Sequence, residues 1–176
     1  IVTRLTEAVQ KRLLRSLVNQ ASLQYYRSIQ HMPGFIQLLM DTIRELKAGG
    51  ITPGAFTSAV QELGRGGRLV EVGRLYQAYQ DKLERQDWTD YIGAGWLARD
   101  ALQGEEIAFP QWTPCIVDGF DDFSPVQIQV LAEMSQCVKR MVITLTAEKD
   151  GSDRPVVHKR FQRTRQQLED ALDLEV

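Results

Sequence analysis

The sequence predicts an α/β fold that is mostly helical, and two patterns support this prediction. Up to about residue 103, apolar side chains recur at steps of three and four, which is typical of amphipathic helices. After residue 114, two short runs rich in β-branched residues lie on either side of one helical segment, which is the order of a parallel β-α-β unit. We therefore expect a helical subdomain over residues 1–108 and part of an α/β core over residues 109–176.

Helix-breaking and capping residues separate the segments of the helical part. Pro33 suits the first turn of a helix, and Gly49-Gly50 ends that helix. Thr6 and Thr89 are expected to act as N-caps. The helices that we expect, about six in all, cover residues 3–19, 21–31, 33–47, 52–63, 68–86 and 89–103.

The α/β part follows a loop over residues 104–114 that glycine and proline interrupt. Ser124 and Gln127 have the spacing of a capping box at the start of the helix that follows the first strand. Because a two-stranded parallel pair is not a complete sheet, we expect further strands outside this sequence. The elements that we expect are strand 115–120, helix 125–136, strand 139–146 and helix 156–173.

Composition and charge exclude several classes of protein. A net charge of −2 over 176 residues gives no global attraction to nucleic acid or to membranes. No apolar run approaches the length of about 18 residues that a membrane span needs, and no secretory leader is recognisable, so we expect a cytoplasmic protein without a membrane partner. Cys115 and Cys137 are expected to be reduced, buried thiols. Because the first residue is Ile1 and not Met, we interpret the sequence as a piece of a longer protein.

The turn after the first expected strand carries acids in a position typical of nucleotide hydrolases. In those enzymes an Asp at the carboxyl end of a strand holds Mg²⁺, and a Glu beside it polarises the attacking water. Asp118 has the first position here, but Gly119 follows it and has no side chain that could act as a base. The sequence also has no Gly-x-x-x-x-Gly-Lys-Ser/Thr loop to hold phosphates. We therefore expect no catalytic residue, no cofactor and no metal site, with Asp118 as the one candidate ligand.

A purely structural interpretation of the same acids stays open. Asp118 and Asp122 would then be strand-end and turn residues, and Asp122 would lie next to the positive N-terminal end of the following helix. Asp121 would be a solvated turn residue. On this interpretation the acids stabilise the turn locally and have no chemical role.

Residues 117–127, Val-Asp-Gly-Phe-Asp-Asp-Phe-Ser-Pro-Val-Gln, resemble the second motif of UvrD/Rep-like superfamily 1 helicases, which reads Val-Asp-Glu-Phe-Gln-Asp before a Thr or Ser and a helix. They are more similar still to the form Val-Asp-Gly-Phe-x-x-Phe-Thr-Pro, found in the inactivated AddB (RexB)-type subunits of helicase–nucleases, with Ser in place of Thr. Residues 34–56 and 75–90 look like the helical insertion of the same family.

This resemblance implies a degenerate Walker B-like motif. Active helicases have the magnesium-binding Asp at the position of Asp118, the catalytic Glu at that of Gly119 and a Gln at that of Asp121. The helical part would be a 1B-like insertion subdomain, and the α/β part would belong to a RecA-like P-loop helicase core. The residues of the degenerate motif are Asp118, Gly119, Asp121 and Asp122.

The function that the resemblance implies is that of a non-catalytic, helicase-like scaffold subunit of an ATP-dependent helicase/nuclease. Such a subunit acts in DNA end processing and recombinational repair, contacts DNA and pairs with an active helicase–nuclease subunit. ATP and Mg²⁺ would enter only if a phosphate loop existed outside this sequence. Two other functions stay open: a nucleotide-binding DNA helicase ATPase in which Asp118 holds Mg²⁺, and a pure protein-interaction module.

Two basic segments are candidates for contacts with DNA phosphates. Residues 1–30 contain one acid, Glu7, and residues 154–165 contain none. A solvated helix face is the alternative interpretation of both segments. Tyr25 and Trp88 are among the aromatic residues that could stack on bases, although their helical spacing favours core positions. The residues expected to contact DNA are Arg4, Lys11, Arg12, Arg15, Lys159, Arg160, Arg163 and Arg165.

Overall fold

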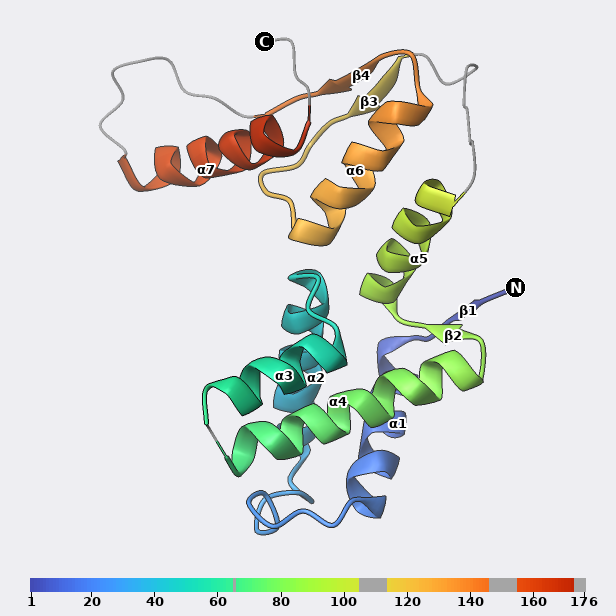
Figure 1. Ribbon diagram of the computed structural model, residues 1–176, viewed down its shortest axis with the longest axis vertical. Coiled ribbons are helices and arrows are strands. Elements are labelled where there is room, and N and C mark those ends of the chain that lie inside the picture. Colours follow the sequence, from blue (N-terminus) through green and yellow to red (C-terminus); the bar gives the residue numbers. More distant parts are fainter. Residues whose placement is uncertain (65, 105–113, 146–154, 173–176) are drawn as a thin grey trace. The chain divides into compact units, whose positions relative to one another are not determined.

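The structure of the chain is a computed structural model with two compact units, residues 1–94 and 95–176. Most of the described residues are helical, and two pairs of short parallel strands complete the structure (Figure 1). This confirms the predicted α/β, mostly helical fold class. The predicted boundary between residues 108 and 109 lies outside the described residues, and the roles of the two predicted domains stay predictions. The described residues are 1–64, 66–104, 114–145 and 155–172, with the backbone alone at 155–160.

The first unit consists of helices and one strand pair. Its elements are β1 (Thr3–Arg4), α1 (Glu7–Gln20), α2 (Pro33–Ala48), α3 (Pro53–Glu62), α4 (Arg68–Arg85), β2 (Trp88–Thr89) and the first turn of α5 (Tyr91–Gly104). The long helix α4 contacts both α1 and α3, and α1 also contacts α2 (Figure 1). α2 and α3 begin at prolines, as predicted, because a proline at the first helical position needs no hydrogen-bonded N–H. Among the described residues, no helix is both long enough and apolar enough to span a bilayer.

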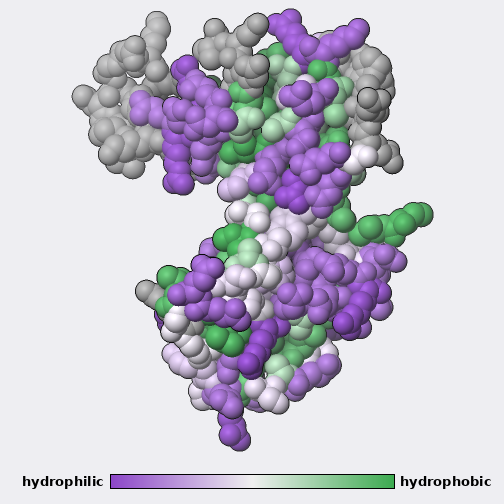
Figure 2. Space-filling view, in the orientation of Figure 1, coloured by the Kyte–Doolittle hydropathy of each residue, from purple (hydrophilic) through white to green (hydrophobic). Residues whose placement is uncertain are grey.

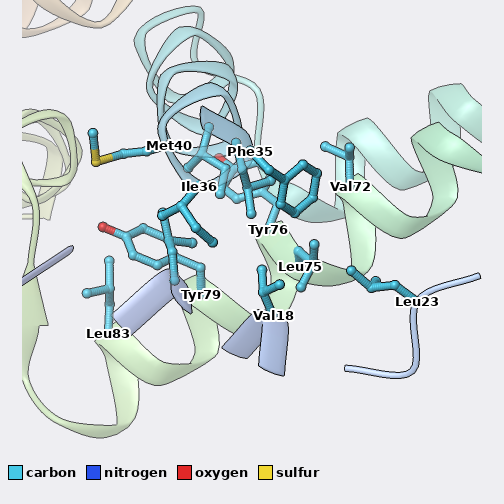
Figure 3. Packing of buried hydrophobic residues seen from close by; sticks show 13 residues of the cluster. Val18, Leu23, Phe35, Ile36, Met40, Val72, Leu75, Tyr76, Tyr79 and Leu83 are labelled. Atoms are coloured by element: carbon cyan, nitrogen blue, oxygen red, sulfur yellow. The ribbon is translucent and has the colours of Figure 1, made fainter. Parts of the chain in front are cut away.

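The core of this unit is formed mainly by α1, α2 and α4. Leu75, Tyr76 and Tyr79 of α4 are each at most 2% exposed. Figure 3 shows the two tyrosine rings beside apolar residues of α2 such as Phe35. The hydroxyl of Tyr76 donates to the carbonyl oxygen of Ile51 at 2.8 Å, so its burial leaves no unpaired donor. On the face shown in Figure 2, the surface of this unit mixes hydrophilic and neutral residues with small hydrophobic patches.

Residues 21–31, which the apolar spacing predicts as a helix, form bends and turns instead, so this prediction is wrong. The reason is the buried side chain of Glu71 on α4. Its carboxylate accepts the backbone N–H groups of Gln24, Tyr25 and Tyr26 at 2.6, 2.8 and 3.1 Å. Since these groups find their partners on α4, the loop does not need helical hydrogen bonds of its own. Five helices, and not about six, therefore lie within the described residues up to 104.

Glu71 makes the stability of this unit depend on pH. Burial alone would raise the pKa of the Glu71 carboxyl, but the three backbone hydrogen bonds and the nearby Arg74 outweigh it and lower the pKa from 4.5. A pKa that is lowered in the folded state adds stability above the unfolded value, and this contribution is lost as the pH falls through the folded value. We expect Glu71→Gln to lower the free energy of unfolding by about 1–3 kcal/mol near pH 7.

The expected difference between the protein and Glu71→Gln shrinks as the pH is lowered from about 5 to about 3, because a protonated Glu71 resembles a glutamine. Urea denaturation of both proteins across this range measures it. Glu7→Gln is the matched control, since Glu7 is an exposed acid that pairs with Lys11 and Arg44. A stability difference for Glu71→Gln that stays constant with pH would contradict the prediction.

The strand pair of this unit was not predicted from the sequence. β1 pairs in parallel with β2, with Arg4 opposite Thr89, and the N–H of Leu5 donates to the carbonyl oxygen of Thr89 at 2.8 Å. The helix predicted over residues 3–19 therefore begins only at Glu7. Arg4 lies on a strand, and its predicted place on a helix is wrong.

A buried ion pair links α2 to the N-terminus of α5. Lys47 Nζ lies 2.8 Å from Asp90 Oδ2, and the two side chains are 1% and 6% exposed. The Asp90 carboxylate also accepts the hydroxyl of Tyr79 at 3.1 Å and the N–H of Gly93 at 2.7 Å. Asp90 thus caps α5, where the sequence predicts Thr89 as the cap. Burial lowers the pKa of the Lys47 ammonium, and the charge of Asp90 opposes this shift.

The second unit contains the predicted parallel β-α-β order. Its elements are the rest of α5, β3 (Cys115–Val117), α6 (Pro125–Cys137), β4 (Met141–Ile143) and α7 (Pro155–Ala171). β3 and β4 pair in parallel, with Ile116 opposite Val142, and α6 connects them along the chain. Both strands are shorter than predicted, and β3 ends where the chain turns at Gly119.

The strand pair of this unit is packed on one face. Val117 and Ile143 contact a small core to which both α6 and α7 contribute. On the other face Ile116 is 64% exposed, so the described residues do not cover that face. The buried members of the core are Phe123, Ile128, Leu131, Leu168 and Leu172.

Candidate functional site

The candidate site is the turn between β3 and α6, where the sequence predicts a degenerate Walker B-like motif. Asp118 follows the last residue of β3 directly and is exposed. The hydroxyl of Thr144 donates to the Asp118 carboxylate, and the backbone N–H of Thr144 donates to the carbonyl oxygen of Val117 at 3.0 Å. Thr144 is a site residue that was not predicted from the sequence. A signal for it was present, because both residues directly follow neighbouring parallel strands, whose carboxyl ends lie at one edge.

Gly119 has a backbone conformation that favours glycine. Its φ is +81°, in the left-handed region, where a Cβ atom is strained by roughly 1–2 kcal/mol. No heavy atom lies within 4 Å of the place where a Cβ would be, so space is not the obstacle. A glutamate at this position would therefore fit sterically but would carry backbone strain.

Of the other two acids of the turn, Asp121 lines the same small hollow as Asp118, whereas Asp122 lines a different one. Asp121 and Asp122 are both exposed. The hydroxyl of the buried Thr164 lies 3.5 Å from the Asp121 carbonyl oxygen and 3.4 Å from Asp122 Oδ1, so it ties this part of the turn to α7. Within the part of the chain that the structure describes, no three His, Cys, Asp or Glu side chains gather in a way that could hold a metal ion.

The residues of the turn do not fit a magnesium–nucleotide site. Asp118 offers a single carboxylate, and one of its oxygens already accepts the hydrogen bond of Thr144. The hollow that Asp118, Gly119 and Thr144 help to line has a volume of only about 280 Å³, which is less than the usual size of a ligand pocket. We derive no reaction step through Mg²⁺ or ATP at this turn.

Residues close in sequence stabilise the start of α6. The N–H of Gln127 donates to Ser124 Oγ at 3.3 Å, and the N–H of Ser124 donates to Gln127 Oε1 at 2.8 Å, which confirms the predicted capping box. The ring of Phe120 stacks on that of Phe123, with 5.0 Å between centroids. Hydrogen bonds at the cap and apolar contacts at the phenylalanines thus shape a turn whose acids are exposed to solvent.

The predicted basic residues of the first unit differ in their exposure and in their ion pairs. Arg12 and Arg15 are exposed on α1. Lys11 Nζ lies 2.7 Å from the carboxylate of Glu7, which Arg44 of α2 also reaches at 3.3 Å. The single acid of this segment therefore lies within its positive surface and partly neutralises it.

The predicted basic residues near the C-terminus have three different outcomes. The side chains of Lys159 and Arg160 lie outside the described residues. Arg163 is exposed and lines a hollow beside the start of α6. Arg165 pairs with Glu169 at 2.6 Å, an exposed interaction worth little stability. None of these observations tests contact with phosphates, which stays a prediction for all eight residues.

Fold and turn together define a mostly helical α/β protein with a strand–Asp–helix motif that has no glutamate beside its Asp. The family model described as "ADDB, N-terminal" matches residues 2–174, and the chain belongs to this family. The resemblance to AddB-type proteins is confirmed by this match, whereas the wider relation to superfamily 1 helicases stays a prediction.

Curated relatives agree with this family. The chain is 28% identical over 150 residues to a protein of Alkaliphilus metalliredigens, an alignment that covers 81% of this chain and 13% of the relative. It is 25% identical over 158 residues to a protein of Staphylococcus haemolyticus, covering 86% of this chain and 13% of the relative. Both relatives are named as the B subunit of an ATP-dependent helicase/deoxyribonuclease. The chain thus spans about an eighth of the length of these relatives.

Proposed function

We propose that this chain is the N-terminal, helicase-like part of the B subunit of an ATP-dependent helicase/deoxyribonuclease that acts in DNA end processing and recombinational repair. It serves there as a scaffold that helps to hold DNA and does not itself hydrolyse ATP. The family membership and the names of the relatives support the assignment to the B subunit. The protein works in the cytoplasm together with an active helicase–nuclease subunit.

The observation that carries the scaffold proposal is the conformation of Gly119. An ATPase of the superfamily 1 type needs a glutamate beside the magnesium-binding Asp. Here the position has no side chain and a φ of +81°, which favours glycine over any other residue. The turn is thus adapted to its glycine, and we infer that it is a helicase motif retained for its architecture.

The alternative is a nucleotide-binding helicase ATPase with Asp118 as the magnesium ligand. Asp118 is exposed at the carboxyl end of a strand, which favours this alternative because a magnesium-binding Asp of an open α/β sheet lies at that end. The hydrogen bond from Thr144 weighs against it, and among the described residues no three His, Cys, Asp or Glu side chains gather at the turn to hold a metal ion.

Replacement of Asp118 by alanine in the full-length protein, assembled with a partner subunit whose own ATP hydrolysis has been abolished by mutation, distinguishes the two functions. We expect the DNA-stimulated rate of ATP hydrolysis to stay within about twofold of the unchanged complex, whereas loss of a group that a catalytic site needs lowers rates by about 10²-fold or more. Thr144→Val is the matched control, since it removes the hydrogen bond to Asp118 and leaves the carboxylate. A hundredfold loss with Asp118→Ala but not with Thr144→Val would establish the ATPase.

A further inference from the structure

We propose that Tyr25, together with the arginines around it, forms a stacking site for a base of single-stranded DNA. This inference rests on the proposed function, because it takes DNA to be a ligand of the protein. The helical spacing of the sequence favours a core position for Tyr25, and the structure contradicts this: its side chain is 58% exposed. The neighbouring Tyr26 is the residue that packs against the core.

The exposed ring of Tyr25 is held in place from three sides. Its backbone N–H donates to the buried carboxylate of Glu71 at 2.8 Å. Its ring meets that of Tyr26 edge to face, with centroids 5.1 Å apart and an interplanar angle of 78°. A Cβ added at Gly67 would lie 3.5 Å from Tyr25 Cδ2, so the glycine backbone at the start of α4 approaches the ring closely. Because these contacts already hold the loop and the ring, a base that stacks on Tyr25 costs little additional conformational entropy.

Arginines lie near this ring along the chain and on the helix whose first turn approaches it. Arg27, Arg68 and Arg74 are all exposed, on the same loop and on the adjoining part of α4. Burial raises the pKa of the Tyr26 hydroxyl, and the charge of Arg68 opposes this rise. The charge of Arg74 helps to lower the pKa of the Glu71 carboxyl. The negative charge of Glu71 is buried, and its carboxylate accepts hydrogen bonds from three backbone N–H groups. Proteins bind single-stranded nucleic acid with aromatic rings beside basic side chains, so that a base stacks on the ring and phosphates contact the cations.

The geometry selects single strands over duplex DNA. In a duplex both faces of each base are covered by its neighbours, so a ring at the protein surface has no face to stack on unless a base leaves the helix. Every base has a free face in a single strand, and stacking on tyrosine accepts all of them. We therefore expect little sequence preference at Tyr25 itself.

The test measures the affinity of the full-length protein for single-stranded oligothymidylate. We expect Tyr25→Ala to weaken binding by about 5- to 100-fold, the range measured for loss of one stacked base. Tyr25→Phe keeps the ring and should bind within about twofold of the unchanged protein. With an abasic oligonucleotide, which has the phosphates without bases, the unchanged protein and Tyr25→Ala should bind equally. An oligonucleotide that carries 5-iodouracil should crosslink to Tyr25 on irradiation, as mapped by mass spectrometry.

Tyr91→Ala is the matched control, because Tyr91 is 68% exposed and has no part in this site. It should leave the affinity unchanged. If the protein binds the oligonucleotide with unchanged affinity in Tyr25→Ala and without a crosslink, the inference fails and the proposed function stands. If the unchanged protein binds no DNA, the proposed function fails and the inference with it. If Tyr25→Ala weakens association with the partner subunit and not with DNA, the surface is a protein interface and the inference is overturned.

Discussion

Replacement of Asp90 by alanine is expected to lower the free energy of unfolding of the first unit by about 3–5 kcal/mol, the usual cost of removing one partner of a buried ion pair. Most of this cost comes from Lys47, which is 1% exposed and would keep a buried charge without its counter-ion. The same substitution leaves the hydroxyl of Tyr79 and the N–H of Gly93 without their acceptor. A single side chain thus stabilises α2, α4 and the first turn of α5 at once.

Hydrogen–deuterium exchange resolved by peptide measures this loss, because it reports on the first unit separately. Exchange in α2 and α4 should accelerate together in Asp90→Ala. The double variant Lys47→Met/Asp90→Asn should lose much less stability, since no buried charge remains and the asparagine can still accept the N–H of Gly93. Glu7→Ala breaks only exposed ion pairs and should change stability by at most about 1 kcal/mol. Equal exchange in Asp90→Ala and Glu7→Ala would refute a dominant role for the buried pair.

The helices whose ends are marked by a proline, a glycine or a capping side chain could be predicted from the sequence. α2, α3 and α6 each begin at a proline, and Ser124 and Gln127 cap α6 as their spacing predicts. Local signals suffice where proline, glycine or a capping side chain decides the end of an element, because these act within a few residues.

The sequence could not predict the elements that depend on distant partners. Residues 21–31 have a helical apolar pattern, but the deciding interaction is with Glu71, which is 45 to 47 positions away from the three N–H groups it binds. The strands β1 and β2 have two residues each, too few for any periodicity, and pair across the whole unit. Lys47 looks in the sequence like any other lysine near the end of a helix, and only the fold brings Asp90 to it.

The candidate site shows the same division. The exposed acids, the capping box and the missing base were predictable, because each depends on residue type and on neighbours in sequence. The hydrogen bond between Thr144 and Asp118 depends on the pairing of β3 with β4, and the contact of Thr164 depends on where α7 packs. In the structure, the turn that carries the motif is held by Thr144, which follows β4, and by Thr164 of α7.

Replacement of Phe123 by alanine is expected to lower the free energy of unfolding of the second unit by about 3–5 kcal/mol, as for other buried phenylalanines. Phe123 is 5% exposed and lies in the small core between the strands, α6 and α7. Its ring also supports Phe120 by stacking. Because this core has few buried members, the cavity left by Phe123 cannot be filled without moving α7 or the turn itself.

Asp121→Ala is the matched variant in the same turn, and it should change stability by no more than about 0.5 kcal/mol, because Asp121 is exposed and uses only its backbone oxygen in the contact with Thr164. Hydrogen exchange in β3, α6 and α7 of the two variants measures the contrast, and Phe123→Leu should fall between them. If the motif is retained for architecture, its stability depends on the phenylalanine in the core and not on the Asp121 carboxylate. A larger loss with Asp121→Ala than with Phe123→Ala would mean that the Asp121 carboxylate has a structural or chemical partner at this turn, and the scaffold interpretation would have to be given up.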